Sequence, residues 1–285
     1  MSNLFLNPLL IEKVVRAALE EDLGRAGDIT SQACIPEGTQ ARCVLAPRKP
    51  GTISGLSVAE AAFRIMDPSV KFEYLAQDGD AITVARTPVA RITGDARAIL
   101  TAERTALNFI CHMSGIATMT ATLVELTKHT KAKVICTRKT TPNLRAFEKY
   151  AIRCGGGMNN RFGLDDAVFI KDNHIAVAGG VKQALRAAKA SVGHLVKIEI
   201  EVDSLDQLKD VIEEGADVVL FDNMTPAQMA EGVKMIGGRM KTEASGGISA
   251  ATAKAVAESG VDVLSSGALT HSAPILDLGL DIEIG

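Results

Sequence analysis

The sequence lacks the features of several common protein classes. Its five cysteines are odd in number and form no C-x-x-C pair, so neither a disulfide framework nor a zinc site is indicated. No apolar run reaches about 18 residues, and the N-terminus has no basic flank followed by an apolar stretch. The net charge of −3 gives no reason to expect nucleic acid or a membrane surface as a partner. We therefore expect a cytoplasmic protein.

The composition is that of a soluble protein with a large core. The chain has 285 residues, of which 47% are hydrophobic and 23% charged. This length suits one large or two moderate domains.

Six short segments between residues 134 and 266, most of them apolar, are each followed by a charged or small polar cluster. They end at residues 136, 170, 200, 221, 244 and 264. These ends lie roughly 20 to 34 residues apart, about one βα unit each. Capping residues such as Ser204 and Thr225, with glycines such as Gly215, predict helices between them. The pattern favours a parallel α/β barrel, which places its functional residues at the carboxyl ends of its strands. An open sheet of Rossmann type remains possible, although no G-x-G-x-x-G motif follows the first strand.

The first part of the chain predicts a separate domain of helices and short strands. Helices are expected at 9–23 and 57–66, and two more at 95–128, separated near Ser114-Gly115. Short strands are expected near 41–45, 52–54, 71–74, 81–84 and 89–93. We assign residues 1–112 to this domain, residues 113–273 to the barrel, and expect the tail 274–285 to pack back on the first domain.

One helix face in this domain contains an oddity. Leu100, Leu107 and Ile110 form an apolar stripe, yet Glu103 and Arg104 fall on or beside it. Charged side chains there are costly unless paired. One interpretation is a structural ion pair. The other is that Arg104 projects into a cavity, which could belong to a second subunit.

Cationic residues follow several of the predicted strands. Arg138, Lys139 and Lys171 come closely after apolar segments, and Arg161 follows a run of three glycines. Converging guanidinium groups indicate a polyanionic ligand, because each binds carboxylate or phosphate through two parallel hydrogen bonds. The alternative is a set of structural ion pairs with nearby aspartates. Lys171 could also form a Schiff base as in barrel aldolases, which borohydride trapping would reveal.

A second group of basic residues has a simpler interpretation. Thr141-Pro142 predicts the start of a helix, on which Arg145, Lys149 and Arg153 are spaced four residues apart. We interpret them as its solvated face. His174 and His271 also follow strand ends, and each is expected to make local hydrogen bonds rather than bind a metal.

Two carboxylates and two glycine turns complete the candidate site. Glu201 and Asp222 follow successive strands and could hold Mg²⁺ through few protein ligands, act as acid and base, or stabilise a developing cation. They could instead be satisfied by neighbouring lysines. The turns follow the last two strands, where barrels commonly bind phosphate through backbone N–H groups, although ordinary tight turns are the alternative. Their residues are Ser245, Gly246 and Gly247 in one turn, and Ser266 and Gly267 in the other.

These residues lie in motifs that resemble the quinolinate phosphoribosyltransferase family, also called carboxylating nicotinate-nucleotide pyrophosphorylase. The similarity runs nearly end to end. The motifs are EDLG at 21–24, GDIT at 27–30, ERTALN at 103–108, TRKTTP at 137–142, GGG at 155–157, NNR at 159–161, IKDNH at 170–174, EVD at 201–203, FDN at 221–223, EASGG at 243–247 and GALTHS at 267–272.

The resemblance implies the fold and the reaction. The fold is an N-terminal α/β sandwich-like domain followed by an open, incomplete α/β barrel, the type II phosphoribosyltransferase architecture. The expected reaction joins quinolinate to phosphoribosyl pyrophosphate (PRPP) with Mg²⁺, and gives nicotinate mononucleotide, pyrophosphate and CO₂ for NAD biosynthesis. The expected assembly is a homodimer in which each first domain covers the partner's barrel.

The resemblance also implies a role for each matched residue. Arg138, Arg161 and Lys139 would bind quinolinate, joined by Arg104 from the partner chain. Lys171 would lie between quinolinate and pyrophosphate, and Glu201 and Asp222 would face the ribose and the Mg²⁺-linked oxygens. The turns at Ser245-Gly246-Gly247 and Ser266-Gly267 would hold the 5′-phosphate. Lys139, Lys171, Glu201 and Asp222 are the expected catalytic residues.

One position departs from the family pattern. The family usually has histidine immediately before the arginine of the Asn-x-Arg stretch, and here that position is Asn160. An amide can form hydrogen bonds but cannot take on a proton and its charge. Two rival functions remain open: a relative of the same architecture that takes another base, and a binding protein without turnover.

Overall fold

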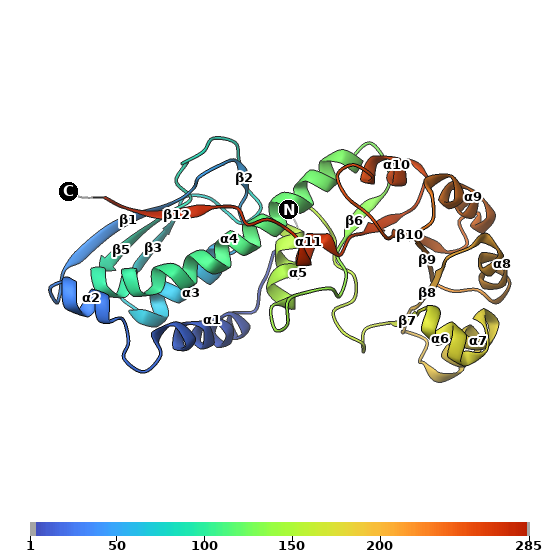
Figure 1. Cartoon of the computed structure of the whole chain (residues 1–285), viewed down its shortest axis with the longest axis horizontal. Coiled ribbons are helices and arrows are strands. Elements are labelled where there is room, and N and C mark those ends of the chain that lie inside the picture. The colour runs from blue at the N-terminus through green and yellow to red at the C-terminus, as the bar shows by residue number, and fades with distance from the viewer. Residues whose placement is uncertain (1–3, 284–285) are drawn as a thin grey trace. The chain divides into compact units, whose positions relative to one another are not determined.

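The computed structural model describes residues 4–283 and divides the chain into two units, each built on its own sheet (Figure 1). Unit 1 contains the residues up to Ala121, Ala146–Gly156 and the residues from Ala273 onward. Unit 2 contains Thr122–Arg145 and Gly157–Ser272.

Unit 1 has an antiparallel sheet with helices packed by their apolar faces. Its strand order is β12-β1-β5-β3, and a short pair, β2-β4, lies outside this sheet. The strands are β1 (Gln40–Pro47), β2 (Gly51–Thr52), β3 (Lys71–Tyr74), β4 (Ala81–Ile82), β5 (Ala90–Asp95) and β12 (Leu278–Glu283). The helices are α1 (Pro8–Leu23), α2 (Ile29–Cys34), α3 (Leu56–Met66), α4 (Ala96–Thr127) and α5 (Arg145–Cys154); the end of α4 from Thr122 and the first residue of α5, Arg145, belong to unit 2.

Local capping explains where the first helices begin. The Asn7 side chain accepts a hydrogen bond from the Leu9 N–H, and Gly24 ends α1. The Asp28 carboxylate accepts from the Ser31 N–H and so caps the start of α2.

The prediction of two helices within 95–128 was wrong, because α4 is a single helix of 32 residues. A Cβ atom at Gly115 would lie 2.2 Å from the Pro274 carbonyl oxygen. Gly115 therefore allows the C-terminal tail to pack closely against α4 and does not end a helix. This helix is also long and apolar enough to cross a membrane by length and composition, but 56% of its most apolar window is buried inside the protein.

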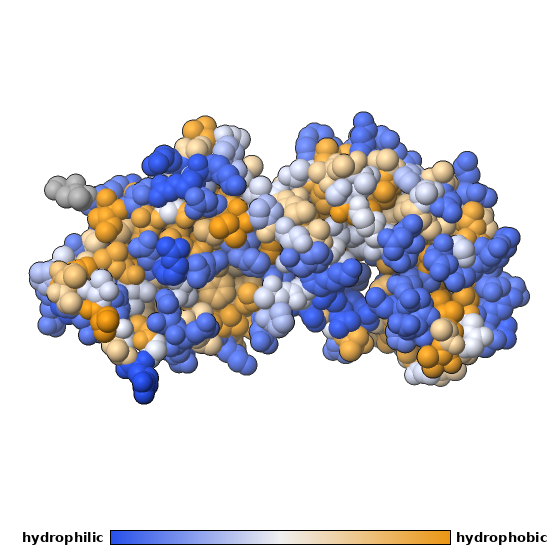
Figure 2. Space-filling model, viewed as in Figure 1, coloured by the Kyte–Doolittle hydropathy of each residue, from blue (hydrophilic) through white to orange (hydrophobic). Residues whose placement is uncertain are grey.

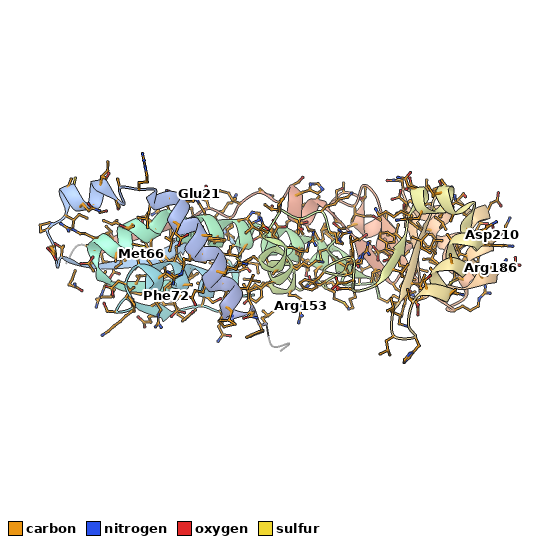
Figure 3. All side chains as sticks on the ribbon, turned by 90° about the horizontal axis from the view of Figure 1, so that it is seen from below. Glu21, Met66, Phe72, Arg153, Arg186 and Asp210 are labelled. Carbon is orange, nitrogen blue, oxygen red and sulfur yellow. The ribbon has the colours of Figure 1, made fainter. Side chains whose placement is uncertain are left out.

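The predicted solvated face of the next helix was also partly wrong. Helix α5 begins at Arg145 and not at Pro142, because Asn143 has a left-handed φ of 66°. Lys149 is fully buried, whereas Arg153, labelled in Figure 3, is exposed. Glu148 is also fully buried and contacts His112 across 2.9 Å.

Unit 2 is a six-stranded parallel sheet whose edges do not close. The strand order is β6-β11-β10-β9-β8-β7, which confirms the expected open α/β barrel. The strands are β6 (Lys133–Ile135), β7 (Val168–Ile170), β8 (Ile198–Val202), β9 (Val218–Asp222), β10 (Lys241–Ser245) and β11 (Val263–Ser265). The helices between them are α6 (Asp172–Ala178), α7 (Val181–Ser191), α8 (Leu205–Glu214), α9 (Pro226–Ile236), α10 (Ala253–Glu258) and α11 (Ala268–His271).

Alternation along these strands gives the sheet two chemically different faces. One face is apolar and carries Ile198, Ile200, Val219, Phe221 and Ala244, all buried. It packs against the helices, since a Cβ at Gly232 of α9 would touch the Phe221 ring at 2.8 Å. The register places polar and charged residues on the opposite face: Glu199, Glu201, Asp222, Glu243, Ser245 and Ser265.

The outer helices carry the solvated charges of unit 2. Lys182 of α7 pairs with Asp210 and Glu213 of α8, and Arg186 pairs with Glu214. Arg186 and Asp210 are labelled in Figure 3, and hydrophilic residues cover much of these helices in Figure 2. Exposed pairs of this kind contribute little stability, so the fold depends on the apolar face of the sheet.

The close approach at Gly115 gives a stability prediction. Replacing Gly115 by Ala should lower the free energy of unfolding by about 1–3 kcal/mol, because the backbone of the tail cannot move aside cheaply. Helix propensity alone would favour alanine there by about 1 kcal/mol. The sign of the measured change in the free energy of unfolding therefore shows which effect dominates. Denaturant unfolding would measure it. The control is Gly193→Ala, whose Cβ meets nothing within 4 Å, and equal stability of the two variants would contradict the packing.

Candidate active site

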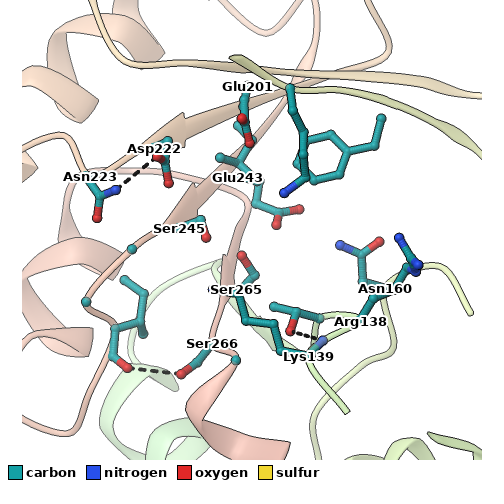
Figure 4. A pocket seen from close by; sticks show the side chains of 18 of the residues that line it. Arg138, Lys139, Asn160, Glu201, Asp222, Asn223, Glu243, Ser245, Ser265 and Ser266 are labelled. Atoms are coloured by element: carbon teal, nitrogen blue, oxygen red, sulfur yellow. Dashed lines mark hydrogen bonds between the residues drawn. The ribbon is translucent and has the colours of Figure 1, made fainter. Parts of the chain in front are cut away.

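A cavity of about 830 Å³ lies at the carboxyl ends of the parallel strands of unit 2 (Figure 4). With one exception, it brings together the candidate site residues from the sequence. These are Arg138, Lys139, Arg161, Lys171, Glu201, Asp222, Ser245, Gly246, Gly247, Ser266 and Gly267. Arg104 is the exception: it is exposed on α4 in unit 1 and does not line this cavity.

Two arginines in the cavity carry positive charge that the described residues compensate only in part. Arg138 follows β6, and its buried Nε has no hydrogen-bond partner among residues 4–283. Arg161 donates from Nη1 to the Ala167 carbonyl oxygen at 2.9 Å. Burial lowers the pKa of Arg161 and the charge of Arg138 lowers it further, whereas Glu199 and Asp166 oppose this shift. A bound anion would satisfy both guanidinium groups.

An aromatic ring holds two of the cations. The Arg161 Cζ lies 5.3 Å and the Lys171 Nζ 5.1 Å from the centroid of the Phe169 ring, within the range of cation–π attraction. The backbone N–H of Lys171 donates to His174 Nδ1 at 2.9 Å. His174 therefore makes a local hydrogen bond, as predicted.

Lys139 is held by contacts to its backbone, and a glycine makes room for its side chain. Its N–H donates to Thr137 Oγ1 at 3.1 Å, and its carbonyl accepts from Thr270 Oγ1 at 2.7 Å. A Cβ at Gly267 would lie 2.7 Å from the Lys139 Cδ. Glycine at 267 thus lets the lysine stem cross the turn.

Glu201 and Asp222 end neighbouring strands and reach the cavity (Figure 4). The Glu201 Oε1 accepts from the Asp172 N–H at 2.9 Å, and the Asp222 Oδ2 accepts from Asn223 Nδ2 at 2.9 Å. Among residues 4–283, no group of three or more His, Cys, Asp or Glu side chains could enclose a metal ion. Two carboxylates nevertheless fit Mg²⁺, which completes its shell with water and substrate oxygens.

The turn after β10 requires glycine. Gly246 and Gly247 have left-handed φ angles of 92° and 62°. A Cβ at Gly246 would lie 2.0 Å from Asn223 Oδ1. Ser266 Oγ donates to the Ile248 carbonyl at 3.0 Å and so joins this turn to the one after β11. Both turns therefore present backbone at the cavity, where an oxyanion can approach closely.

Several lining residues were missed from the sequence. They include Phe169, Asn223, Glu243 and Ser265. Glu243 belongs to the predicted strand that ends at residue 244, and Glu199 to the one that ends at residue 200. The available signal was the alternation of Lys197, Glu199 and Glu201, which puts charges on one face of a strand.

Asn160 also lines the cavity, at the position that departs from the family pattern. Its Oδ1 accepts from the Arg161 N–H at 2.5 Å. The amide thus shapes the backbone that carries Arg161, in keeping with the expectation that it can still form hydrogen bonds.

Comparison with known proteins gives a consistent result. Family models match both parts of the chain: "Quinolinate phosphoribosyl transferase, N-terminal domain" over residues 28–114 and "Quinolinate phosphoribosyl transferase, C-terminal domain" over residues 116–281. The chain is 45% identical over 275 residues to the carboxylating nicotinate-nucleotide pyrophosphorylase of Mycobacterium leprae, covering 94% of this chain and 95% of that protein. It is 39% identical over 279 residues to a probable enzyme of the same name from Bacillus subtilis, covering 98% and 96%.

Solved structures agree over nearly the whole length. The nicotinate-nucleotide pyrophosphorylase from Francisella tularensis superposes with a TM-score of 0.93 at 36% identity and covers 98% of each chain. The enzyme of that name from Ehrlichia chaffeensis gives a TM-score of 0.91 at 35% identity, covering 95% of this chain and 98% of that one.

Proposed function

The chain belongs to the quinolinate phosphoribosyltransferase family, and we propose how its pocket carries out the reaction of that family. The chain transfers the phosphoribosyl group of PRPP to quinolinate and forms nicotinate mononucleotide, pyrophosphate and CO₂ in NAD biosynthesis. One observation carries the proposal: the buried Arg138 Nε lacks a partner in a cavity that also holds Arg161, Lys139 and Lys171.

Quinolinate is a dianion and occupies the cationic part of the cavity. Arg138 and Arg161 bind its two carboxylates, because guanidinium forks match carboxylate geometry. The bound dianion also offsets the repulsion between the two guanidinium groups. Lys139 adds a third positive charge. Neutral pyridines would leave these groups unpaired, which favours a dicarboxylate over the other bases that related enzymes could take.

PRPP occupies the other part of the cavity. Its 5′-phosphate lies against Ser245-Gly246-Gly247 and Ser266-Gly267, where the absence of side chains lets phosphate oxygens reach the backbone. Its pyrophosphate lies beside Lys171. Glu201 and Asp222 face the ribose and would hold Mg²⁺ together with water and substrate oxygens. When bound, Mg²⁺ supplies positive charge that offsets the charge of the leaving pyrophosphate.

The residues of the pocket then act on developing charge. The quinolinate ring nitrogen attacks C1 of the ribose while the bond from C1 to pyrophosphate oxygen breaks. Lys139 and Lys171 stabilise the departing negative charge, and Glu201 and Asp222 stabilise positive charge at C1. The ring nitrogen is now cationic. It accepts electron density from the adjacent carbon as that carbon loses CO₂, and a proton takes the place of the carboxyl group.

The proposal includes a homodimer in which Arg104 enters the partner's cavity. Arg104 is exposed beside the apolar stripe of α4 and makes no salt bridge within residues 4–283. An unpaired arginine next to apolar surface suits an interface that supplies an anion.

The proposal places the enzyme in the cytoplasm, where its five free cysteines suit a reducing compartment.

Removing Arg138 tests quinolinate recognition. Arg138→Ala should raise the KM for quinolinate by about 100-fold, since it removes a charge-assisted contact worth roughly 3 kcal/mol. Steady-state kinetics at saturating PRPP would measure this. Arg153→Ala, at an exposed position on α5, should match the unaltered enzyme. An unchanged KM in Arg138→Ala would refute the assignment.

The Mg²⁺ assignment predicts a change in metal requirement. A chelator should abolish turnover, and added Mg²⁺ should restore it. Asp222→Asn should raise the Mg²⁺ concentration for half-maximal rate by about tenfold, because an amide oxygen carries no charge. Asp206→Asn, on the exposed side of α8, is the control. A Mg²⁺ requirement that is the same in both variants would contradict the role of Asp222.

Mixing two inactive variants tests the sharing of Arg104. At a quinolinate concentration near the KM of the unaltered enzyme, homodimers of Arg104→Ala and of Arg138→Ala should both be nearly inactive. After exchange of subunits at equal amounts, about one quarter of the sites should combine an intact barrel with an intact Arg104. The measured rate should recover to about a quarter of the unaltered rate. Absence of recovery, with exchange shown by differently tagged subunits, would mean that Arg104 serves its own chain or neither.

A further inference from the structure

Asn223 lies between two parts of the active site and has a backbone conformation that is unusual for a residue with a side chain. It directly follows Asp222 at the end of β9, and its φ of 53° is left-handed. Asparagine is one of the few residues other than glycine that adopt this region readily. Asn223 also lines the cavity, and the reaction proposed above gives it no role.

The Asn223 side chain holds the Asp222 carboxylate. Its Nδ2 donates to the Asp222 Oδ2 at 2.9 Å, which Figure 4 draws as a dashed line. No other group within residues 4–283 donates a hydrogen bond to this carboxylate. Glu201 differs, because its carboxylate accepts from a backbone N–H, that of Asp172. The orientation of Asp222 therefore depends on a single side chain.

The other end of the same amide faces the turn after β10, Ser245-Gly246-Gly247. A carboxylate can only accept hydrogen bonds, so the amide nitrogen must face Asp222 and the amide oxygen must point away from it. A Cβ at Gly246 would lie 2.6 Å from the Asn223 Cγ and closer still to Oδ1. The Asn223 N–H also donates to the Ser245 carbonyl at 3.0 Å. Asn223 thus contacts both the acid and the glycine turn.

We propose that Asn223 is a positioning residue that holds the Asp222 carboxylate at a fixed place relative to the turn 245–247. The proposal rests on the function proposed above, in which Asp222 faces the ribose of PRPP and the turn holds its 5′-phosphate. These two groups belong to one substrate molecule, so covalent bonds limit the distance between them. A site that fixes the matching distance in advance binds both groups with less loss of freedom.

Asn223→Gly removes the amide and keeps the backbone. Glycine adopts a left-handed φ without strain, and the hydrogen bond from the N–H of residue 223 to Ser245 remains possible. The matched control is Asn143→Gly. Asn143 is also left-handed, with a φ of 66°, but it is exposed and does not line the cavity. Both substitutions make the same chemical change in the same backbone conformation.

Two ligands of different size separate the link from the turn itself. Thermal-shift titrations in a metal chelator would give the Kd of ribose 5-phosphate and of inorganic phosphate. Asn223→Gly should raise the Kd of ribose 5-phosphate about fivefold and change that of phosphate by less than about twofold, because only the larger ligand reaches Asp222. Asn143→Gly should change neither. Equal weakening of both ligands, or of neither, would overturn the link.

Turnover and a second variant extend the test. With Mg²⁺ present, Asn223→Gly should lower kcat/KM for PRPP about tenfold and leave the KM for quinolinate within about twofold. Asn223→Asp keeps the shape and tolerates the left-handed φ, but it replaces the donor by a second acid. It should weaken ribose 5-phosphate at least as much, and it takes the place of Asn223→Gly if that variant fails to fold. Normal affinity in Asn223→Asp would overturn the role of the donor.

A comparison with Asp222→Ala shows which idea fails. Adding Asn223→Gly to Asp222→Ala should weaken ribose 5-phosphate no further, since the amide then has no carboxylate to hold. Normal affinity of Asp222→Ala for ribose 5-phosphate would overturn the ribose contact of the proposed function. Weakening in Asp222→Ala but not in Asn223→Gly would overturn only the positioning role of Asn223.

Discussion

The period-two alternation of the parallel strands is the constraint on which the site depends. Along β8 and β9, every second side chain is apolar and packs against the helices, while those between, like Glu243 and Ser245 of β10, lie on the cavity face. A shift of one residue in any of these strands would place Glu201 or Asp222 in the helical core and an isoleucine or phenylalanine in the pocket. The same pairing that forms the sheet therefore sets the chemistry of its inner face.

Charge balance is the second requirement of this inner face. Four cationic side chains meet at one end of the sheet, and Arg138 retains a buried donor without a partner. The chain offsets this charge only in part, with the Phe169 ring and with the charges of Glu199 and Asp166. An incompletely balanced site binds anions well, because the ligand supplies what the protein lacks. The uncompensated positive charge also destabilises the protein when no ligand is bound, so the burial of the apolar sheet face must supply the stability.

Much of the architecture could be predicted from the sequence, because the strands and their caps carry local signals. The six parallel strands, the caps at Ser204 and Thr225, and the residues that follow each strand could all be predicted in this way. The failures have a common cause. Gly115 was read as a helix break because its contact with Pro274 is remote in sequence. Lys149 was read as solvated although it is fully buried, and helical spacing says nothing about what lies opposite. Glu243 lies level with Glu201, across Leu220, only because β8 and β10 flank β9.

The C-terminal strand has a consequence for how the chain is made. β12 pairs with β1 along Arg42 to Pro47, so the sheet of unit 1 is completed by residues that are synthesised after all of unit 2. Both segments of unit 2 precede the last segment of unit 1 in the chain, so unit 2 can finish folding first. Until β12 arrives, β1 remains an open edge available to other chains. During synthesis, the vulnerable species is thus a nascent chain with a finished barrel and an unfinished N-terminal sheet, which binding by a chaperone would protect.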